Sequence, residues 1–139
     1  MNHGSFAIED ALLTQILEAA EKAYPFECCG ILLGSDDGAV KEIKEVRNVV
    51  SGEKQRVGFS IDPLELYRCE TEAKKRNVQI VGFYHSHPDA PARLSNEDIK
   101  GMIPDMTYVV VSALNGKRSE VNAYKIKTCD KRRQTCQFT

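Results

Sequence analysis

The sequence predicts a single α/β (α+β) domain built on a mixed β-sheet that is flanked by helices. Two long segments carry apolar residues at helical spacing, and short runs rich in strand-forming residues lie around and between them. The 139 residues, of which 42% are hydrophobic, suffice for one globular core. We therefore expect one domain over residues 1–139. Its ends, residues 1–5 and about 128–139, are expected to be flexible, the second being an edge strand or a frayed end.

The first part of the chain predicts a helix and a strand hairpin. Residues 9–24 place an apolar stripe along one side of a helix, and Pro25 ends that helix. The apolar segment 26–34 suits a buried strand, since glycines punctuate it. The turn signal Asp-Asp-Gly at 36–38 then leads into a longer, half-exposed strand over 39–50.

The middle of the chain predicts a loop, a short strand and the second helix. Residues 51–56 are polar and indicate a loop, whereas 57–61 indicate a short strand. Asp62 fits the N-cap of a helix over 62–77, because Pro63 follows at the first helical position. The inner side of this helix is expected to carry Leu66, Cys69 and Ala73.

The last part of the chain predicts the central strand and a hairpin. Residues 78–87 form a strand by their apolar composition, and Ser95 opens a short helix after a loop. Residues 106–114 carry a valine run typical of a buried strand. Asn115-Gly116 is a type I′ turn signal, so the segment 119–127 is expected to pair back onto that strand.

Composition excludes several classes of protein. A net charge of −1 and a pI of about 6.3 argue against a nucleic-acid partner, which would require a basic surface. The chain has no signal-peptide pattern and no apolar run long enough to span a bilayer, so we expect a cytoplasmic protein without a membrane partner. No C-x-x-C motif indicates a zinc ribbon or a thioredoxin-like site. The five cysteines are therefore expected to be free thiols: Cys28, Cys29, Cys69, Cys129 and Cys136.

The segment 82–98, GFYHSHPDAPARLSNED, carries the candidate chemistry. His85 and His87 point to one side of a strand, with Cα atoms roughly 6.5–7 Å apart, so both imidazoles can reach one zinc ion. Ser95 and Asp98 stand three residues apart at a helix start and can face the same point. Two histidines and one aspartate leave the fourth zinc position for water, which is the pattern of a catalytic rather than a structural site.

Each half of this pattern has a simpler explanation. A lone His-x-His on a strand is more often part of the surface or the core than a metal site. The sequence Ser-Asn-Glu-Asp is by default a capping box, in which the serine and the aspartate satisfy the first turn of a helix. The combination favours a metal site, because all the ligand-type residues fall within 14 positions at a strand end and a helix start.

This combination resembles the motif of the JAMM (MPN+) metalloprotease family, H-S-H-P followed by S-x-x-D. The upstream segment Pro-Phe-Glu-Cys-Cys-Gly at 25–30 resembles the family segment that carries a glutamate, here Glu27. The resemblance covers nearly the whole chain, with no departure at a motif position. It implies a JAB1/MPN fold, which is broadly similar to that of cytidine deaminases. The motif residues are His85, His87, Pro88, Ser95 and Asp98.

The resemblance also implies roles for these side chains. His85, His87 and Asp98 would hold one zinc ion, with water in the fourth position. Glu27 would act as the general base that takes a proton from this water and returns it to the leaving amine. Ser95 would hydrogen-bond the developing oxyanion. The same hydroxyl is expected to cap the helix, so these two roles could compete.

The family cleaves amide or isopeptide bonds that follow the C-terminal Gly-Gly of ubiquitin-like proteins. The compact chain looks like the small prokaryotic branch that acts on ubiquitin-like sulfur-carrier proteins, for example to release cysteine in cysteine biosynthesis. One alternative is an isopeptidase that removes a ubiquitin-like modifier from lysines. Another is a non-catalytic MPN scaffold, which the complete residue set disfavours. A zinc deaminase is also disfavoured, because its H-x-E and P-C-x-x-C signatures are absent.

Overall fold

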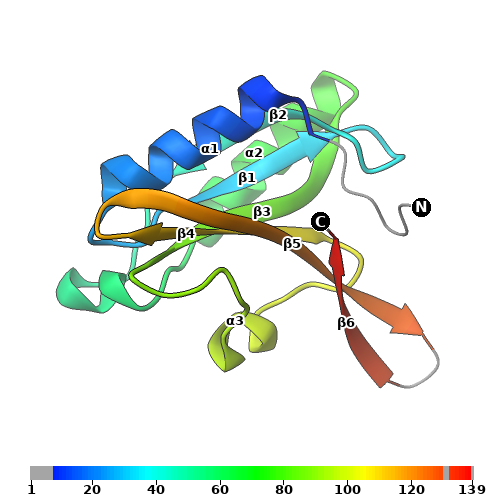
Figure 1. Cartoon of the computed structure of the whole chain (residues 1–139). Helices are drawn as coiled ribbons and strands as arrows, with labels where there is room; N and C mark the ends of the chain where they lie inside the picture. The colour runs from blue at the N-terminus through cyan, green and yellow to red at the C-terminus, as the bar shows by residue number, and fades with distance from the viewer. Residues whose placement is uncertain (1–7, 130–131, 139) are drawn as a thin grey trace.

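A computed structural model describes the backbone of residues 8–129 and 132–138 and the side chains of residues 8–126 (Figure 1). One six-stranded sheet with strand order β2-β1-β3-β4-β5-β6 forms its centre. The β3–β4 pair is parallel and the other pairs are antiparallel, so the predicted mixed sheet is confirmed. The elements are α1 (Asp10–Ala23), β1 (Cys29–Gly34), β2 (Val40–Val46), the 3₁₀ helix η1 (Gly52–Arg56), α2 (Pro63–Lys75), β3 (Gln79–Pro88), α3 (Asn96–Lys100), β4 (Thr107–Leu114), β5 (Lys117–Cys129) and β6 (Arg132–Phe138).

The two long helices cover opposite faces of the sheet (Figure 1). On one face, Ile16 and Ala20 of α1 pack with residues of β1, β3 and β4 such as Leu32. On the other face, Cys69 and Ala73 of α2 join a second apolar cluster. Successive side chains of a strand point to opposite faces, so every central strand contributes to both clusters. The predicted burial of both helix stripes is confirmed.

The predicted helix and turn signals are found where the sequence places them. The Asp62 carboxylate caps α2 by accepting from the backbone N–H of Leu64 at 3.0 Å. Asn115 and Gly116 have φ values of 52° and 83°, as a type I′ turn between β4 and β5 requires. Gly82 lies on β3 where a Cβ would collide with the backbone carbonyl of Thr107, so this position allows the close β3–β4 pairing.

The strand predicted over residues 57–61 is wrong, and most of the loop predicted over 51–56 forms the helix η1 (Gly52–Arg56). β2 ends at Val46, before the expected boundary at 50. The 57–61 segment lies beside residues 48–50, but only the Val49 N–H bonds to it through the backbone, at the Ser60 carbonyl, and the Asn48 side chain makes two further hydrogen bonds. The Asn48 amide donates to the Gly58 carbonyl at 3.0 Å and accepts from Ser60 N–H at 3.2 Å. This side-chain bridge replaces the backbone ladder that a strand would need.

The ends of the chain carry the remaining expectations. The tail forms β6 along the edge of the sheet, which is one of the two predicted possibilities. The expectation for residues 1–5 falls outside the described residues. Among the residues that the structure describes, every helix is too short or too polar to cross a membrane.

Candidate metal centre

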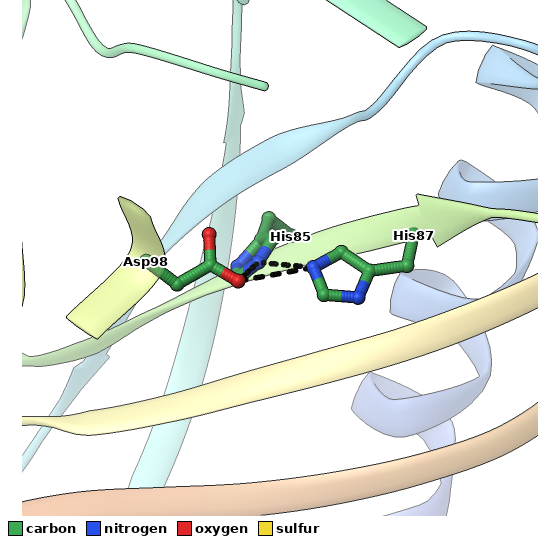
Figure 2. Close-up of side chains that lie close together, drawn as sticks. All are labelled: His85, His87 and Asp98. Carbon is green, nitrogen blue, oxygen red and sulfur yellow. Dashed lines mark hydrogen bonds and ion pairs between the residues drawn. The ribbon is translucent and has the colours of Figure 1, made fainter. Parts of the chain in front are cut away.

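Three candidate ligands converge at the end of β3 (Figure 2). His85 and His87 project from the same side of β3, and Asp98 approaches from the first turn of α3. The Nε2 atoms of the two histidines are 3.2 Å apart. The Asp98 Oδ2 atom lies 3.2 Å from Nε2 of His85 and 3.0 Å from Nε2 of His87.

These separations fit a zinc ion. A tetrahedral site with zinc–ligand bonds of about 2.0–2.1 Å has ligand atoms roughly 3.3 Å apart. The three donor atoms already stand 3.0–3.2 Å from one another, so little movement is needed for all three to reach one ion. Two imidazoles and one carboxylate are also a donor set that zinc accepts. The predicted ligand residues are therefore brought together, and no other described residues form a comparable group.

The His87 ring is oriented by the loop that follows β3. Its Nδ1 atom lies 2.9 Å from the carbonyl oxygen of Pro91. A carbonyl can only accept, so Nδ1 carries a hydrogen and Nε2 is the atom that faces Asp98. Burial lowers the pKa of His87, but the hydrogen bonds to Asp98 and to the Pro91 carbonyl, together with the charges of Asp98 and Glu27, outweigh burial and raise the pKa. In the metal-free molecule a proton therefore favours the place between these two groups, where it competes with a metal ion.

The His85 ring is held by stacking instead. It packs against Phe59, with ring centroids 4.5 Å apart and planes inclined by 25°. Only 1% of His85 is exposed, and its Nδ1 atom is buried without a hydrogen-bond partner among the described residues. Burial lowers the pKa of His85 and so favours the neutral ring, which is the form that binds a metal.

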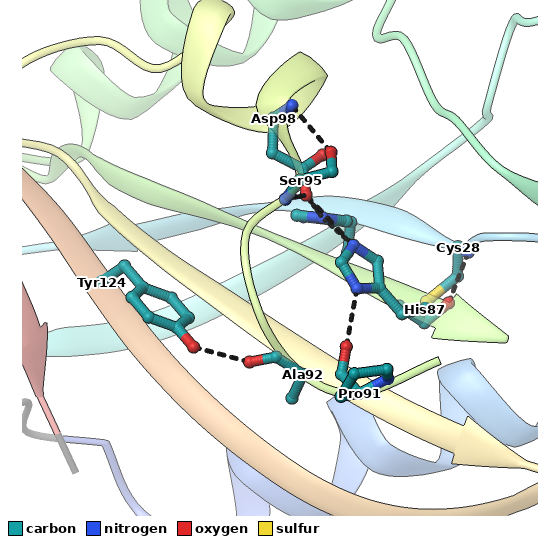
Figure 3. Close-up of polar contacts among 9 residues, drawn as sticks. Cys28, His87, Pro91, Ala92, Ser95, Asp98 and Tyr124 are labelled. Atoms are coloured by element: carbon teal, nitrogen blue, oxygen red, sulfur yellow. Dashed lines mark hydrogen bonds and ion pairs between the residues drawn. The ribbon is translucent and has the colours of Figure 1, made fainter. Parts of the chain in front are cut away.

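The Asp98 carboxylate both caps α3 and faces the two histidines (Figure 3). Its Oδ2 atom accepts from the Ser95 backbone N–H at 2.9 Å, while its own N–H donates to Ser95 Oγ at 3.0 Å. Burial would raise the pKa of Asp98, but hydrogen bonds from His85 and His87 hold it well below the usual range. Ser95 Oγ accepts in the cap, so its hydroxyl hydrogen is left to donate elsewhere. The two predicted uses of this hydroxyl therefore do not compete.

Glu27 reaches the site through the pairing of β1 with β3. Cys29 pairs with His85, and the Cys28 carbonyl accepts from Ser86 N–H, which places Glu27 opposite His87. Glu27 is 6% exposed, and its Oε1 atom is buried without a partner among the described residues. Burial raises its pKa to about 8. The charge of His87 lowers this pKa by a smaller amount, and the charge of Asp98 raises it. Such a carboxyl exchanges a proton near neutral pH.

The thiols beside Glu27 are buried and are not nucleophiles. Cys28 and Cys29 are free, and burial raises their pKa values to about 11 and about 12. A thiolate is therefore disfavoured at both positions. Cys69 is also a buried free thiol, whereas the side chains of the two C-terminal cysteines lie outside those described.

Sequence reasoning missed several residues that build the site. Phe59 lies in the segment predicted as a strand, and the Pro91 carbonyl is a backbone atom that no residue pattern reveals. Asn48 fixes Glu27 by donating to its carbonyl at 3.1 Å, while the Gln55 carbonyl accepts from Glu27 N–H at 2.7 Å. An isolated asparagine after a strand gives no local signal of this role.

A cavity of about 440 Å³ opens beside the ligands. It is lined by His85 and Asp98 together with mostly apolar side chains from residues 57–61, from α2 and from the segment after α3. An apolar cleft with a few convergent polar groups is the usual form of a ligand site. Substrate could therefore approach the metal centre from this side.

Comparisons with known proteins identify relatives of the chain. The model of a family described as prokaryotic homologs of the JAB domain matches residues 9–127. Desampylase from Haloferax volcanii is 30% identical over 105 residues, which cover 74% of this chain and 74% of that protein. CysO-cysteine peptidase from Mycobacterium tuberculosis is 29% identical over 119 residues, which cover 83% and 78%. Desampylase from Pyrococcus furiosus is 34% identical over 76 residues, but these span only 51% of its length.

Solved structures agree with this relationship. A protein from Desulfitobacterium hafniense matches with a TM-score of 0.74 and 29% identity, over 88% of this chain and 85% of that one. A JAB1/MPN domain protein from Archaeoglobus fulgidus matches with a TM-score of 0.54 and 25% identity, over 82% and 83%. The predicted JAB1/MPN fold is therefore confirmed. As its motifs predicted, the chain belongs to the family of prokaryotic JAB-domain proteins within the JAMM/MPN group.

Proposed function

We propose that this chain is a zinc-dependent metallopeptidase of the cytoplasm. It would hydrolyse the amide or isopeptide bond after the C-terminal Gly-Gly of a ubiquitin-like sulfur-carrier protein, releasing cysteine in one form of the reaction. The observation that carries the proposal is the convergence of His85, His87 and Asp98 with Glu27 alongside. A structural metal site would have four protein ligands and would not require a buried base. A non-catalytic scaffold would require neither the metal ligands nor the base.

The residues of the site suit hydrolysis of an amide bond. A bound zinc ion would lower the pKa of a water molecule and polarise the scissile carbonyl. In its ionised form Glu27 can take a proton from the attacking water, and the burial that raises its pKa makes this carboxylate a stronger base. The same carboxyl can then donate this proton to the leaving amine, so that no free amide anion has to form.

Ser95 is suited to stabilise the oxyanion of the tetrahedral intermediate. Its Oγ atom accepts from Asp98 N–H at 3.0 Å, which orients the hydroxyl and leaves its hydrogen to donate. A preorganised donor of this kind typically contributes about 10²–10³ in rate. Ser95 and Asp98 at the start of α3 would thus supply an oxyanion donor and a metal ligand three residues apart.

Two observations support a ubiquitin-like substrate. The relatives named desampylase and CysO-cysteine peptidase are similar in sequence over 74% and 83% of this chain. The 440 Å³ cavity beside His85 and Asp98 has apolar walls that include Phe59 and Leu66. A narrow Gly-Gly segment could bring the scissile carbonyl close to the ligands, while the preceding side chains would fill this cavity. Removal of a ubiquitin-like modifier from lysines stays a second candidate, because two relatives are named desampylase.

The test uses the zinc-loaded full chain and two substrates. In one, the Gly-Gly of a ubiquitin-like carrier is followed by a single cysteine; in the other, it is joined to a lysine ε-amine. We expect mass spectrometry to show cleavage after Gly-Gly in at least the first. Glu27→Gln should retain zinc and lose cleavage, whereas the exposed Glu45→Gln should behave as wild type. Failure of the zinc-loaded wild type on both substrates would overturn the proposal.

A further inference from the structure

The loop between β3 and α3 is fastened to the sheet at successive residues. The Asp89 N–H donates to the Ala113 carbonyl at 2.8 Å, and the Ala90 carbonyl accepts from Ser112 Oγ at 2.6 Å. The Pro91 carbonyl accepts from His87 Nδ1. This loop connects the two histidine ligands to Asp98, so its backbone sets how the ligands are presented.

The next residue, Ala92, is held by three side chains of β5, of which Figure 3 shows Tyr124. Its N–H donates to Glu120 Oε1 at 2.9 Å. Its carbonyl accepts from Asn122 Nδ2 at 3.0 Å and from the Tyr124 hydroxyl at 2.7 Å. These three residues alternate along β5 and therefore point to one face of the sheet. Ala92 itself is fully buried, so both of its backbone groups need such partners.

The Pro91 carbonyl and the Ala92 N–H belong to one planar peptide unit. In a trans peptide the C=O and N–H bonds point in opposite directions, so a partner that fixes one of them fixes the other. Glu120 holds the N–H end, and the C=O end faces His87 Nδ1 at 2.9 Å. The Pro91 carbonyl is thus the direct partner that a metal-binding histidine ordinarily has, and the peptide connects this carbonyl to the Glu120 carboxylate.

We propose that Glu120, Asn122 and Tyr124 are positioning residues for the metal centre. Glu120 fixes the Pro91–Ala92 peptide, and Asn122 and Tyr124 fix the following Ala92–Arg93 peptide. Together they hold the Pro91 carbonyl so that His87 keeps its hydrogen on Nδ1 and presents Nε2 to the metal. This inference rests on the proposed zinc binding. It assigns a role in metal affinity to three side chains that are 28 to 32 residues distant in sequence from the backbone they hold.

The test measures zinc affinity by competition with a chromophoric chelator. The combined variant Glu120→Ala, Tyr124→Phe should bind zinc about 10–100-fold more weakly, as expected when outer partners of a metal ligand are lost. The single variant Glu120→Gln keeps an acceptor oxygen for the Ala92 N–H and should retain most of the wild-type zinc affinity. Tyr108→Phe is the matched control: Tyr108 pairs with Tyr124 across the sheet, but its hydroxyl bonds to Ile103 N–H instead. Its zinc affinity should match that of wild type.

A second measurement separates this inference from zinc binding itself. In the metal-free protein, nitrogen–proton NMR of His87 should show a hydrogen on Nδ1 that exchanges slowly with solvent in wild type and quickly in the combined variant. Tyr124→Phe alone retains the buried ring and serves if the combined variant does not fold. Wild-type zinc affinity and slow Nδ1–H exchange in a folded variant would overturn the inference. A wild type that binds no zinc would overturn the proposed function and, with it, the role in metal affinity. A slow Nδ1–H that becomes fast in the variant would still show that these residues orient the His87 ring.

Discussion

The backbone N–H of Ser95 donates to Oδ2 of Asp98 at 2.9 Å, and this is the same oxygen that faces both histidines. The carboxylate that completes the capping box is therefore also the proposed metal ligand. The two explanations of the Ser-x-x-Asp pattern are not alternatives, since the cap fixes the rotamer that the metal centre needs. The first turn of α3 thus orients the Asp98 carboxylate toward the two histidines.

Asp98→Asn tests this shared carboxylate. The amide oxygen can still accept from Ser95 N–H, so α3 should stay capped, but the negative charge beside both histidines is lost. We expect zinc affinity to fall by more than the roughly 10–100-fold typical of outer partners. Equilibrium dialysis with metal analysis measures the change. The adjacent Glu97→Gln changes an exposed carboxylate on the same helix and should leave zinc binding intact; equal losses in both variants would contradict the assignment.

Substitutions at Ser95 separate capping from catalysis. Ser95→Ala removes the cap and should cost about 0.5–2 kcal/mol of stability, whereas Ser95→Gly should cost only a few tenths. Both remove the hydroxyl, so both should lower kcat by about 10²–10³ with zinc still bound. Ser95→Thr keeps cap and hydroxyl and should retain most activity. Denaturant unfolding and steady-state kinetics measure the two effects; a glycine variant with full kcat would remove Ser95 from the mechanism.

Glu27 predicts a pH dependence of stability in the metal-free protein. Its pKa is about 8 in the folded state against an ordinary 4.5, so the folded chain binds a proton that the unfolded chain releases between these values. The contribution of Glu27 to the free energy of unfolding is therefore fully present below about pH 4.5 and is lost as the pH rises through about 8. At about 1.4 kcal/mol per pH unit, the loss is on the order of a few kcal/mol.

Glu27→Gln should remove most of this slope, because the amide does not titrate. Thermal or denaturant unfolding of chelator-treated protein between acid and alkaline pH provides the comparison, with Glu45→Gln as the exposed control. Parallel pH profiles for wild type and Glu27→Gln would show that the buried carboxyl keeps an ordinary pKa.

Gly82→Ala tests the close pairing of the two central strands. A Cβ at this position would collide with the Thr107 backbone carbonyl, which cannot rotate away. We expect a loss of about 1–3 kcal/mol or more in unfolding free energy, as for other overpacked positions. Gly101→Ala, where a Cβ meets nothing closer than 3.8 Å, should change stability little. Equal stabilities of the two variants would contradict the account of this contact.

Most of the fold could be predicted because its signals are local. The Asp62 cap, the Asn115-Gly116 turn and the stripes of both long helices depend on residues close in sequence. The wrong strand at 57–61 shows the limit of that reasoning. Its composition suits a strand, but a strand needs a free backbone partner, and the Asn48 side chain takes that place.

The convergence of the candidate ligands could also be predicted, since they lie within one short segment with fixed spacing. The residues that surround and orient these side chains could not be predicted, because strand pairing across the sheet brings them to the site. The register of β1 against β3 places Glu27 opposite His87, and β5 brings Tyr124 to Ala92. Neither contact leaves a pattern in the neighbouring sequence, so only the folded chain reveals them.

The central claim is that hydrolysis at this site depends on a zinc ion held by His85, His87 and Asp98. The most direct measurement follows cleavage of a carrier with Gly-Gly-cysteine at its end by wild type stripped with a chelator, before and after one equivalent of zinc. The account predicts no cleavage before addition, recovery after it, and no recovery for Asp98→Asn. Full activity of the stripped wild type would contradict it.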